Sequence, residues 1–342
     1  MDSKSCDHGG ATTTISAVHT DVIESHILTK CDGASLACAA STSHLLHKLC
    51  NKESLWEDTC NSTWSSIKDS LVRKTILNFP GGYRAFFSDA FPVIRQNPSR
   101  VRHRYEGNIS ELISAVDINY GDEKVFSKVI VTKTDDKSFL QFSFWVDLLE
   151  TKETVKIPLK FEGDENKCML ELEQNLKLSW IVIDPSRKRA VNVSSLRPVS
   201  VKPSCNGYDN QVIFATILSG DYDDNDLSDL VECRVAATLG CKEGKNVKFR
   251  ELNLYLEDMH MRRLSGKKSL RILEEAMESG ERKKGNGGEM KEIYEKYLEL
   301  KGKKMEGKKR KERWLNLVYR LSWVAYLIGF VFLCISLKVF PN

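Results

Sequence analysis

The residues best suited to chemistry form an acidic run at 221–226 (DYDDND). With Asp229 and Glu232, this run supplies oxygen atoms at the first, third, fifth, ninth and twelfth positions of a calcium-binding loop. The sixth position of such a loop needs glycine for its sharp turn, and this chain has Asp226 there. The flanking segments have the alternation of strands rather than the spacing of helices. The pattern therefore favours a solvated acidic hairpin loop over a calcium site.

Other catalytic or metal-binding patterns are missing from the sequence. There is no Walker loop, no Gly-x-Ser-x-Gly, no His-Glu-x-x-His and no kinase motif set. Ten cysteines are scattered without a Cys-x-x-Cys pair, which favours buried free thiols in a reducing compartment over zinc ligands or a disulfide framework. We therefore expect no catalytic residue, no bound metal and no cofactor.

The composition is that of a folded chain large enough for two or three domains. Its 342 residues are 41% hydrophobic and 29% charged, with a formal net charge of +4. The positive charge is local, because residues 262–313 carry 18 Lys+Arg against 10 Asp+Glu. We attribute this basic segment to a role beside a membrane rather than to nucleic acid, and expect no nucleic-acid partner.

A run of short helices is predicted at residues 15–64. Within successive groups the apolar side chains recur at about every fourth position, and Asp32-Gly33 separates the first group from the second. About fifty residues of this kind are too few to bury a large core alone. The helices must therefore act with the rest of the chain, and the first fourteen residues, polar and small, are expected to form a disordered tail.

This stretch resembles an F-box. The residues that match the family pattern are Asp21, Val22, Ile23, Ile27, Leu28, Ser35, Leu36, Leu49, Leu55 and Trp56. Three positions depart from it: His19 replaces a proline, Thr42 a valine and Leu46 a tryptophan. The alternative interpretation of this stretch is an amphipathic helical bundle that is unrelated to the F-box.

The resemblance implies a substrate receptor of an SCF-type ubiquitin ligase that is not itself an enzyme. Family members dock on a Skp adaptor, which links them to cullin, and bind a protein substrate through the rest of the chain. The adaptor-binding residues expected on this basis are Asp21, Val22, Ile23, Ile27, Leu28, Leu36, Leu49, Leu55 and Trp56, with Trp56 as a candidate hot spot. The departures leave open a second interpretation, a membrane-anchored scaffold whose F-box no longer joins a ligase.

A narrower resemblance extends beyond residue 64, to plant F-box proteins with a beta-rich body and a hydrophobic C-terminus. The segments 55–64 and 79–92 carry it. We expect residues 65–108 to form one more helix and an aromatic connector that packs the helices onto the next domain.

Over residues 109–278, the expected substrate-binding domain, the spacing of the apolar residues changes from that of helices to the alternation of strands. Short strands separated by turn residues, with no helix between them, favour an antiparallel sandwich followed by a terminal helix near 269–277. The predicted strands are 111–118, 125–134, 139–149, 155–161, 169–173, 177–183, 190–193, 212–218, 231–238 and 248–256. A sugar- or lipid-binding module acting alone is a third interpretation of this body.

After a charged linker over residues 279–313, the C-terminus is predicted to be a transmembrane tail anchor at 314–340. Residues 321–337 carry no formal charge, and this stretch would be roughly 25 Å long as a helix, the short end of a membrane span. The expected architecture is thus α+β, with an F-box, an antiparallel sandwich-like body and a single-pass helix that holds the body in the cytosol beside a lipid bilayer. The span residues expected to meet lipid are Leu321, Trp323, Leu327, Phe330, Phe332 and Leu337.

Overall fold

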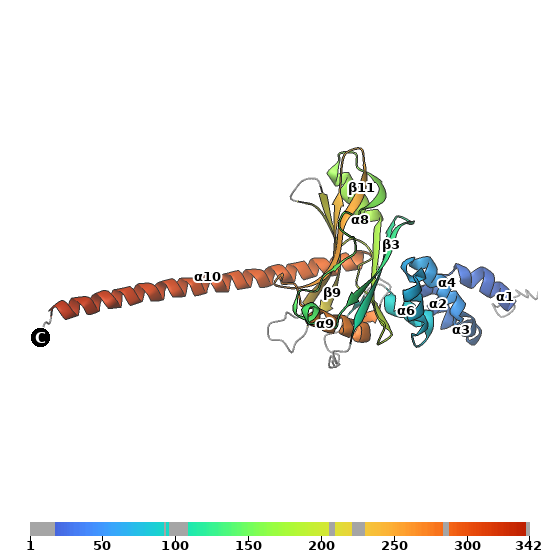
Figure 1. Ribbon diagram of the computed structural model, residues 1–342, viewed down its shortest axis with the longest axis horizontal. Coiled ribbons are helices and arrows are strands. Elements are labelled where there is room, and N and C mark those ends of the chain that lie inside the picture. The colour runs from blue at the N-terminus through green and yellow to red at the C-terminus, as the bar shows by residue number, and fades with distance from the viewer. Residues whose placement is uncertain are drawn as a thin grey trace, which may run out of the picture.

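The computed structural model describes residues 18–91, 94–95, 109–204, 209–220, 230–282 and 287–339. Figure 1 shows a unit of short helices at one end, two β-sheets in the middle, and a long C-terminal helix that runs past the sheets toward the opposite end. The predicted disordered tail at 1–14, most of the acidic run at 221–229 and the later part of the connector lie outside the described residues.

The helical unit covers residues 20–90. Side-chain caps begin several of its helices: Asp32, Ser43 and Asp69 accept hydrogen bonds from backbone N–H groups of the following turns. The Glu53 carboxylate also accepts from the Tyr83 N–H at 2.7 Å, which joins two of the helices. The elements are α1 (Thr20–Val22), η2 (Ile23–Ile27), η3 (Leu28–Lys30), α2 (Gly33–Ala40), α3 (His44–Cys50), α4 (Glu53–Thr63), η4 (Ser66–Lys68), α5 (Ser70–Leu77) and α6 (Gly82–Ala90).

Two antiparallel sheets form the body. The four-stranded sheet has the order β3-β2-β6-β7, with β2 (Glu111–Tyr120), β3 (Glu123–Lys133), β6 (Leu176–Asp184) and β7 (Arg189–Asn192). The six-stranded sheet has the order β4-β11-β10-β9-β8, and β5 pairs with β11. Its strands are β4 (Val146–Asp147), β5 (Val155–Lys160), β8 (Ser200–Pro203), β9 (Asp209–Ser219), β10 (Leu230–Gly240) and β11 (Asn246–Asp258).

One apolar core lies between the two sheets. Alternate residues of the central strands point into it, among them Trp180 on β6, Phe214 on β9 and Leu254 on β11, all fully buried. Helix α9 (Gly266–Ser279) closes the core with Leu270, Leu273, Ala276 and Met277. The mixed helix-and-sheet class, the antiparallel sheets and the N-terminal helices agree with the expected architecture.

Two of the predicted strands are replaced wholly or partly by helices, so the expectation of no helix between the strands is wrong. Residues 169–173 belong to α8 (Glu165–Asn175), which begins where Asp164 accepts a hydrogen bond from the Lys167 N–H and which buries Cys168 and Leu172. Residues 139–149 include the last turn of α7 (Lys137–Gln141) and the short β4. In α8 the apolar side chains lie four residues apart, a helical spacing that the strand prediction overlooked.

The C-terminal helix α10 (Gly287–Val339) corrects the prediction of a membrane anchor. A short pair of strands, β1 (Ile94–Arg95) and β12 (Glu281–Arg282), precedes it. Among the described residues no helix combines the length and the apolar composition that crossing a bilayer requires. The basic run is continuous with the uncharged stretch in α10, and that stretch is only seventeen residues long. The predicted transmembrane anchor and single-pass membrane location are therefore wrong.

The expected span residues are found on this helix. Leu321, Trp323, Leu327 and Phe330 lie on α10 and are exposed. Phe332 and Leu337 also belong to α10, but their side chains lie outside the described part.

Candidate adaptor-binding surface

The nine predicted adaptor-binding residues divide into a buried and an exposed group. Six of them pack in the core of the helical unit, where at most 6% of each residue is exposed: Ile23, Leu28, Leu36, Leu49, Leu55 and Trp56. Asp21, Val22 and Ile27 lie on the surface. A partner that binds the folded unit can therefore touch the second group directly, and the first group supports it from beneath.

Local helix geometry produces this division. Residues 23–27 form one π-helical turn, η2, and the Leu28 N–H bonds to the carbonyl of Ile23, five residues earlier. In a π turn, residues five apart occupy the same side. Ile23 and Leu28 consequently point into the core together, while their neighbours Val22 and Ile27 point outward together. Each aliphatic pair thus supplies one core residue and one surface residue.

Val18 adds one more exposed aliphatic residue to this group. It lies just before His19, the N-cap of α1, and 37% of it is exposed, against 44% each for Val22 and Ile27. We call these three residues the aliphatic stripe. The sequence pattern included Val18 among the apolar repeats but did not mark it as a site residue, and the burial of each side chain is what identifies it.

Trp56 serves the core of the unit. Its indole Nε1 donates a 2.7 Å hydrogen bond to the Cys50 carbonyl oxygen, and its ring centroid lies 5.4 Å from that of Phe87. Only 2% of the residue is exposed. The side chain expected to be a hot spot is therefore covered by its own helical unit, on α4.

The three departures from the family pattern have clear structural roles. His19 caps α1, because its Nδ1 accepts a hydrogen bond from the Asp21 N–H at 3.3 Å. The Thr42 hydroxyl donates to the Ala39 carbonyl oxygen at 2.8 Å at the end of α2. Leu46 packs in the core of the unit. Each of the three residues therefore makes a contact of its own within the helical unit.

The helical unit shares its core with the four-stranded sheet. Ile113, Ala115, Ile181 and Ile183, on the outer face of β2 and β6, belong to the same apolar cluster as Trp56 and the α6 aromatics. As a result the described residues of β6 are buried on both faces of the sheet. The sequence pattern of β6, an almost continuous apolar run, was the available signal for this contact.

Polar contacts fix the orientation of the unit on the sheet. The buried Asp117 carboxylate on β2 accepts hydrogen bonds from the Ser66 N–H at 2.9 Å and from its hydroxyl at 2.6 Å. Burial raises the pKa of Asp117, and the two bonds from Ser66 oppose that shift. Arg189 on β7 also makes an ion pair with Asp89 on α6, with Nε 2.8 Å from Oδ2. These contacts therefore hold the helical unit in one orientation on the body.

A metal centre is not formed by the described part of the chain. No group of three or more His, Cys, Asp or Glu side chains there could hold a metal ion. Of the residues in the calcium-loop pattern only Glu232 is described, and it is fully buried, with an ion pair to Arg234.

Comparison with known proteins gives three closely similar relatives, all from Arabidopsis thaliana. One F-box protein is 38% identical over 341 residues, covering 97% of this chain and 93% of the relative. A second F-box protein is 34% identical, covering 93% and 96%, and a protein named a probable F-box protein is 38% identical, covering 94% and 92%. No protein-family model and no solved structure matches the chain. At this identity over nearly the whole length, the chain belongs to the F-box protein family.

Proposed function

We propose that this chain is the substrate-recognition subunit of an SCF-type ubiquitin ligase and binds the Skp adaptor through its N-terminal helical unit. Its F-box relatives and the outward-facing aliphatic stripe support this proposal. The adaptor links the receptor to cullin and to the subunits that transfer ubiquitin. This chain then needs no catalytic residue, and its contribution is to hold a substrate near the transfer site.

The aliphatic stripe is the proposed adaptor contact. Each of its side chains is a third to a half exposed in the free chain, and covering such a side chain with a partner stabilises a complex by about 1 kcal/mol or more. Asp21 borders the stripe and adds a charge at its rim, where charges govern orientation more than affinity. The six buried residues keep the stripe in place without touching the adaptor.

Co-purification with a Skp adaptor tests the contact. The variant Val22→Asp plus Ile27→Asp places two charges in the stripe without disturbing the core, and we expect it to lose the adaptor. Leu77→Asp is the matched control, because Leu77 is an exposed aliphatic residue at the end of α5, outside the stripe. Leu28 is avoided, since a charge at that buried position would unfold the unit.

Two results would contradict the proposal. If the wild type fails to retain any Skp adaptor, the chain is not a ligase subunit and the scaffold interpretation replaces this one. If the Val22→Asp plus Ile27→Asp variant binds as well as the Leu77→Asp control, the contact lies elsewhere on the unit.

The body is the proposed substrate receptor. Large apolar side chains are exposed beside β4 and the end of β11: Phe142 is 70% exposed and Met261 59%. Between them the Arg263 guanidinium lies 4.3 Å from the centroid of the Trp145 ring, which stacks on Tyr255. Exposed aromatic and arginine side chains are common in protein-binding surfaces. Proximity labelling with the wild type and with Phe142→Ser plus Met261→Ser should differ in the proteins recovered while the Skp adaptor stays bound, and an identical set would contradict this assignment.

A further inference from the structure

Two cysteines that are far apart in the sequence lie together in the body. Cys168 is on α8 and Cys241 directly follows β10, and they are 4% and 8% exposed. The side-chain amide of Asn210, on β9, donates to Sγ of Cys241 at 3.4 Å and to Sγ of Cys168 at 3.7 Å. Each thiol also shifts the pKa of the other. The two thiols are therefore neighbours, held by one shared donor.

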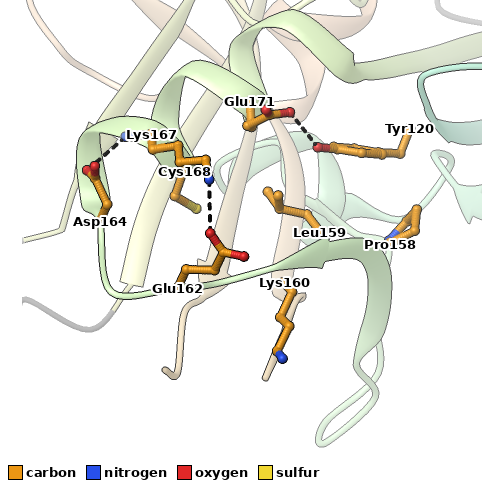
Figure 2. A pocket seen from close by; sticks show the side chains of 9 residues that line it. All are labelled: Tyr120, Pro158, Leu159, Lys160, Glu162, Asp164, Lys167, Cys168 and Glu171. Atoms are coloured by element: carbon orange, nitrogen blue, oxygen red, sulfur yellow. Dashed lines mark hydrogen bonds and ion pairs between the residues drawn. The ribbon is translucent and has the colours of Figure 1, made fainter. Parts of the chain in front are cut away.

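An open cavity gives small solutes access to Cys168. Its volume is about 350 Å³, and Cys168 lines it together with Tyr120, Leu159, Lys167 and Glu171 (Figure 2). Hydrogen bonds keep the wall in place: the Tyr120 hydroxyl donates to the Glu171 carboxylate at 3.2 Å. A peroxide molecule is far smaller than this space, so it can reach the sulfur side of α8 without unfolding of the body.

The surroundings give the two sulfurs different roles. The neighbouring Cys241 thiol lowers the pKa of Cys168, and the Asn210 amide acts in the same direction against the opposing effect of burial. The neighbouring Cys168, together with burial, raises the pKa of Cys241. Cys168 is consequently the member of the pair that exists more readily as the nucleophilic thiolate, and Cys241 is the resolving thiol.

We propose that Cys168 and Cys241 form an oxidation site that reacts with hydrogen peroxide and closes an intramolecular disulfide. The Cys168 thiolate attacks one peroxide oxygen, the O–O bond breaks, and the released hydroxide takes a proton and leaves as water. Cys168 is then a sulfenic acid, oxidised by two electrons. Cys241 loses its proton and attacks the Cys168 sulfur, and the sulfenic oxygen departs as a second water. One peroxide and two thiols thus give one disulfide and two waters, and a dithiol reductant reverses the reaction.

The disulfide would link α8, which precedes β6, to the turn between β10 and β11. Closing so long a loop removes freedom from the unfolded chain, so the oxidised form should have the higher melting temperature. This site is independent of adaptor binding.

Peptide mapping of the full-length chain tests the proposal. The reduced protein is treated with hydrogen peroxide under native conditions, its remaining thiols are alkylated, and it is digested with trypsin. Residues 168–177 and 235–242 are tryptic peptides with one cysteine each. We expect them to appear as one linked species, lighter by two hydrogen atoms than the two thiol peptides together, and dithiothreitol should separate them.

Two variants sharpen the result. In Cys241→Ser, Cys168 should accumulate as a sulfenic acid that dimedone traps, with no linked species. Cys38→Ser is the matched control, because Cys38 is an exposed free thiol on α2, and its linked species should be undiminished. The wild-type map remains decisive if Cys241→Ser folds poorly. Recovery of both wild-type peptides in alkylated form at a peroxide dose that oxidises Cys38, or a link from Cys168 to another cysteine, would overturn the proposal.

Discussion

The two outer faces of the sandwich are covered in different ways. The four-stranded sheet lies against the helical unit through isoleucines on β2 and β6, with Asp117 as the buried charge at the contact. The six-stranded sheet lies against the first turns of α10, where Met290, Tyr294 and Tyr297 pack on apolar residues of β9. Figure 1 shows the two attachments, with the helical unit on one side and α10 leaving on the other.

Buried ion pairs distinguish the second face. Glu232 on β10 accepts hydrogen bonds from the Arg234 guanidinium at 2.6 and 2.8 Å, and its carboxylate lies 3.6 Å from Nζ of Lys301 on α10. Lys301 also donates to Glu257 on β11 at 2.7 Å. Buried charges stabilise one another, so removing one of them leaves its partners unpaired and destabilises the fold.

This difference shows which parts of the molecule can separate. The helical unit and the sheet beneath it share one core, so the aliphatic stripe cannot move relative to the body without exposing apolar side chains. The start of α10 is held by a small apolar cluster and a charge network, which a single substitution can unbalance. Beyond Lys301 the described side chains of α10 are exposed or half-buried.

The largest expected effect is at the charge network. Glu232→Ala leaves Arg234 and Lys301 short of a counter-charge at a fully buried site, and should destabilise the docked helix by about 3–5 kcal/mol. Hydrogen exchange of the amides at 290–301 measures this directly. Glu299→Ala is the control, because Glu299 makes only an exposed pair with Lys303 on the same helix. Unchanged exchange at 290–301 in Glu232→Ala would show that the network does not hold α10.

The apolar face should respond as a single unit. Ile181→Ala removes a fully buried side chain between β6 and the helical unit, which should cost about 3 kcal/mol of unfolding free energy. In urea, fluorescence and circular dichroism should report one shared transition at a lower midpoint. Val131→Ala on β3, where 43% of the residue is exposed, should barely shift it. Separate transitions for the helices and the sheets would contradict the shared core.

Glycines in the two regions should behave in opposite ways. A Cβ at Gly33 would lie 2.2 Å from Cζ of the Phe87 ring, so Gly33→Ala must displace α2 from α6 and should cost about 2 kcal/mol. At Gly302 on α10 nothing lies within 4 Å, and Gly302→Ala should be neutral or slightly stabilising because alanine favours a helix. Thermal melts of both variants compare them, and equal melting temperatures would refute the close packing of α2.

The smallest expected effect is the contribution of Asp117 to the pH dependence of folding stability. Its pKa is raised in the folded chain, so the folded state binds the proton more tightly than the unfolded state. Stability from this group is therefore complete at low pH and falls as pH rises from the ordinary carboxyl value through the folded pKa. Asp117→Asn should lack this decline between pH ~4 and ~7. Parallel urea curves for the two proteins over that range would contradict it.

The sequence predicted the main classes of structure because local patterns encode them. Alternation gave the long strands β9, β10 and β11, and i, i+4 spacing gave the helical unit. Two kinds of information were not local. A short segment can fit the pattern of a strand or of a helix. Residues 169–173 were predicted to be a strand, although Cys168 and Leu172 in α8 have helical spacing. The edge strand β8 is four residues long and ends in Pro203, which leaves almost no pattern to detect.

The candidate site was also predictable only in part. The F-box pattern identified both aliphatic pairs, but it could not decide which member of each pair is buried. That choice depends on the π turn at η2, which no residue type announces. The contacts of Asp117 with Ser66 and of Cys168 with Cys241 join residues that are far apart in the chain, so spacing in the sequence carries no signal for them.

The most direct test of the account compares the neighbours Val22 and Ile23. In Val22→Ala the affinity for a purified Skp adaptor, measured by calorimetry, should fall severalfold while the melting temperature stays unchanged. In Ile23→Ala the unfolding free energy should fall by about 2–4 kcal/mol, because this side chain is fully buried. The reverse outcome, with Val22→Ala unstable and Ile23→Ala stable but unable to bind the adaptor, would contradict the assignment of one core and one surface residue to each pair.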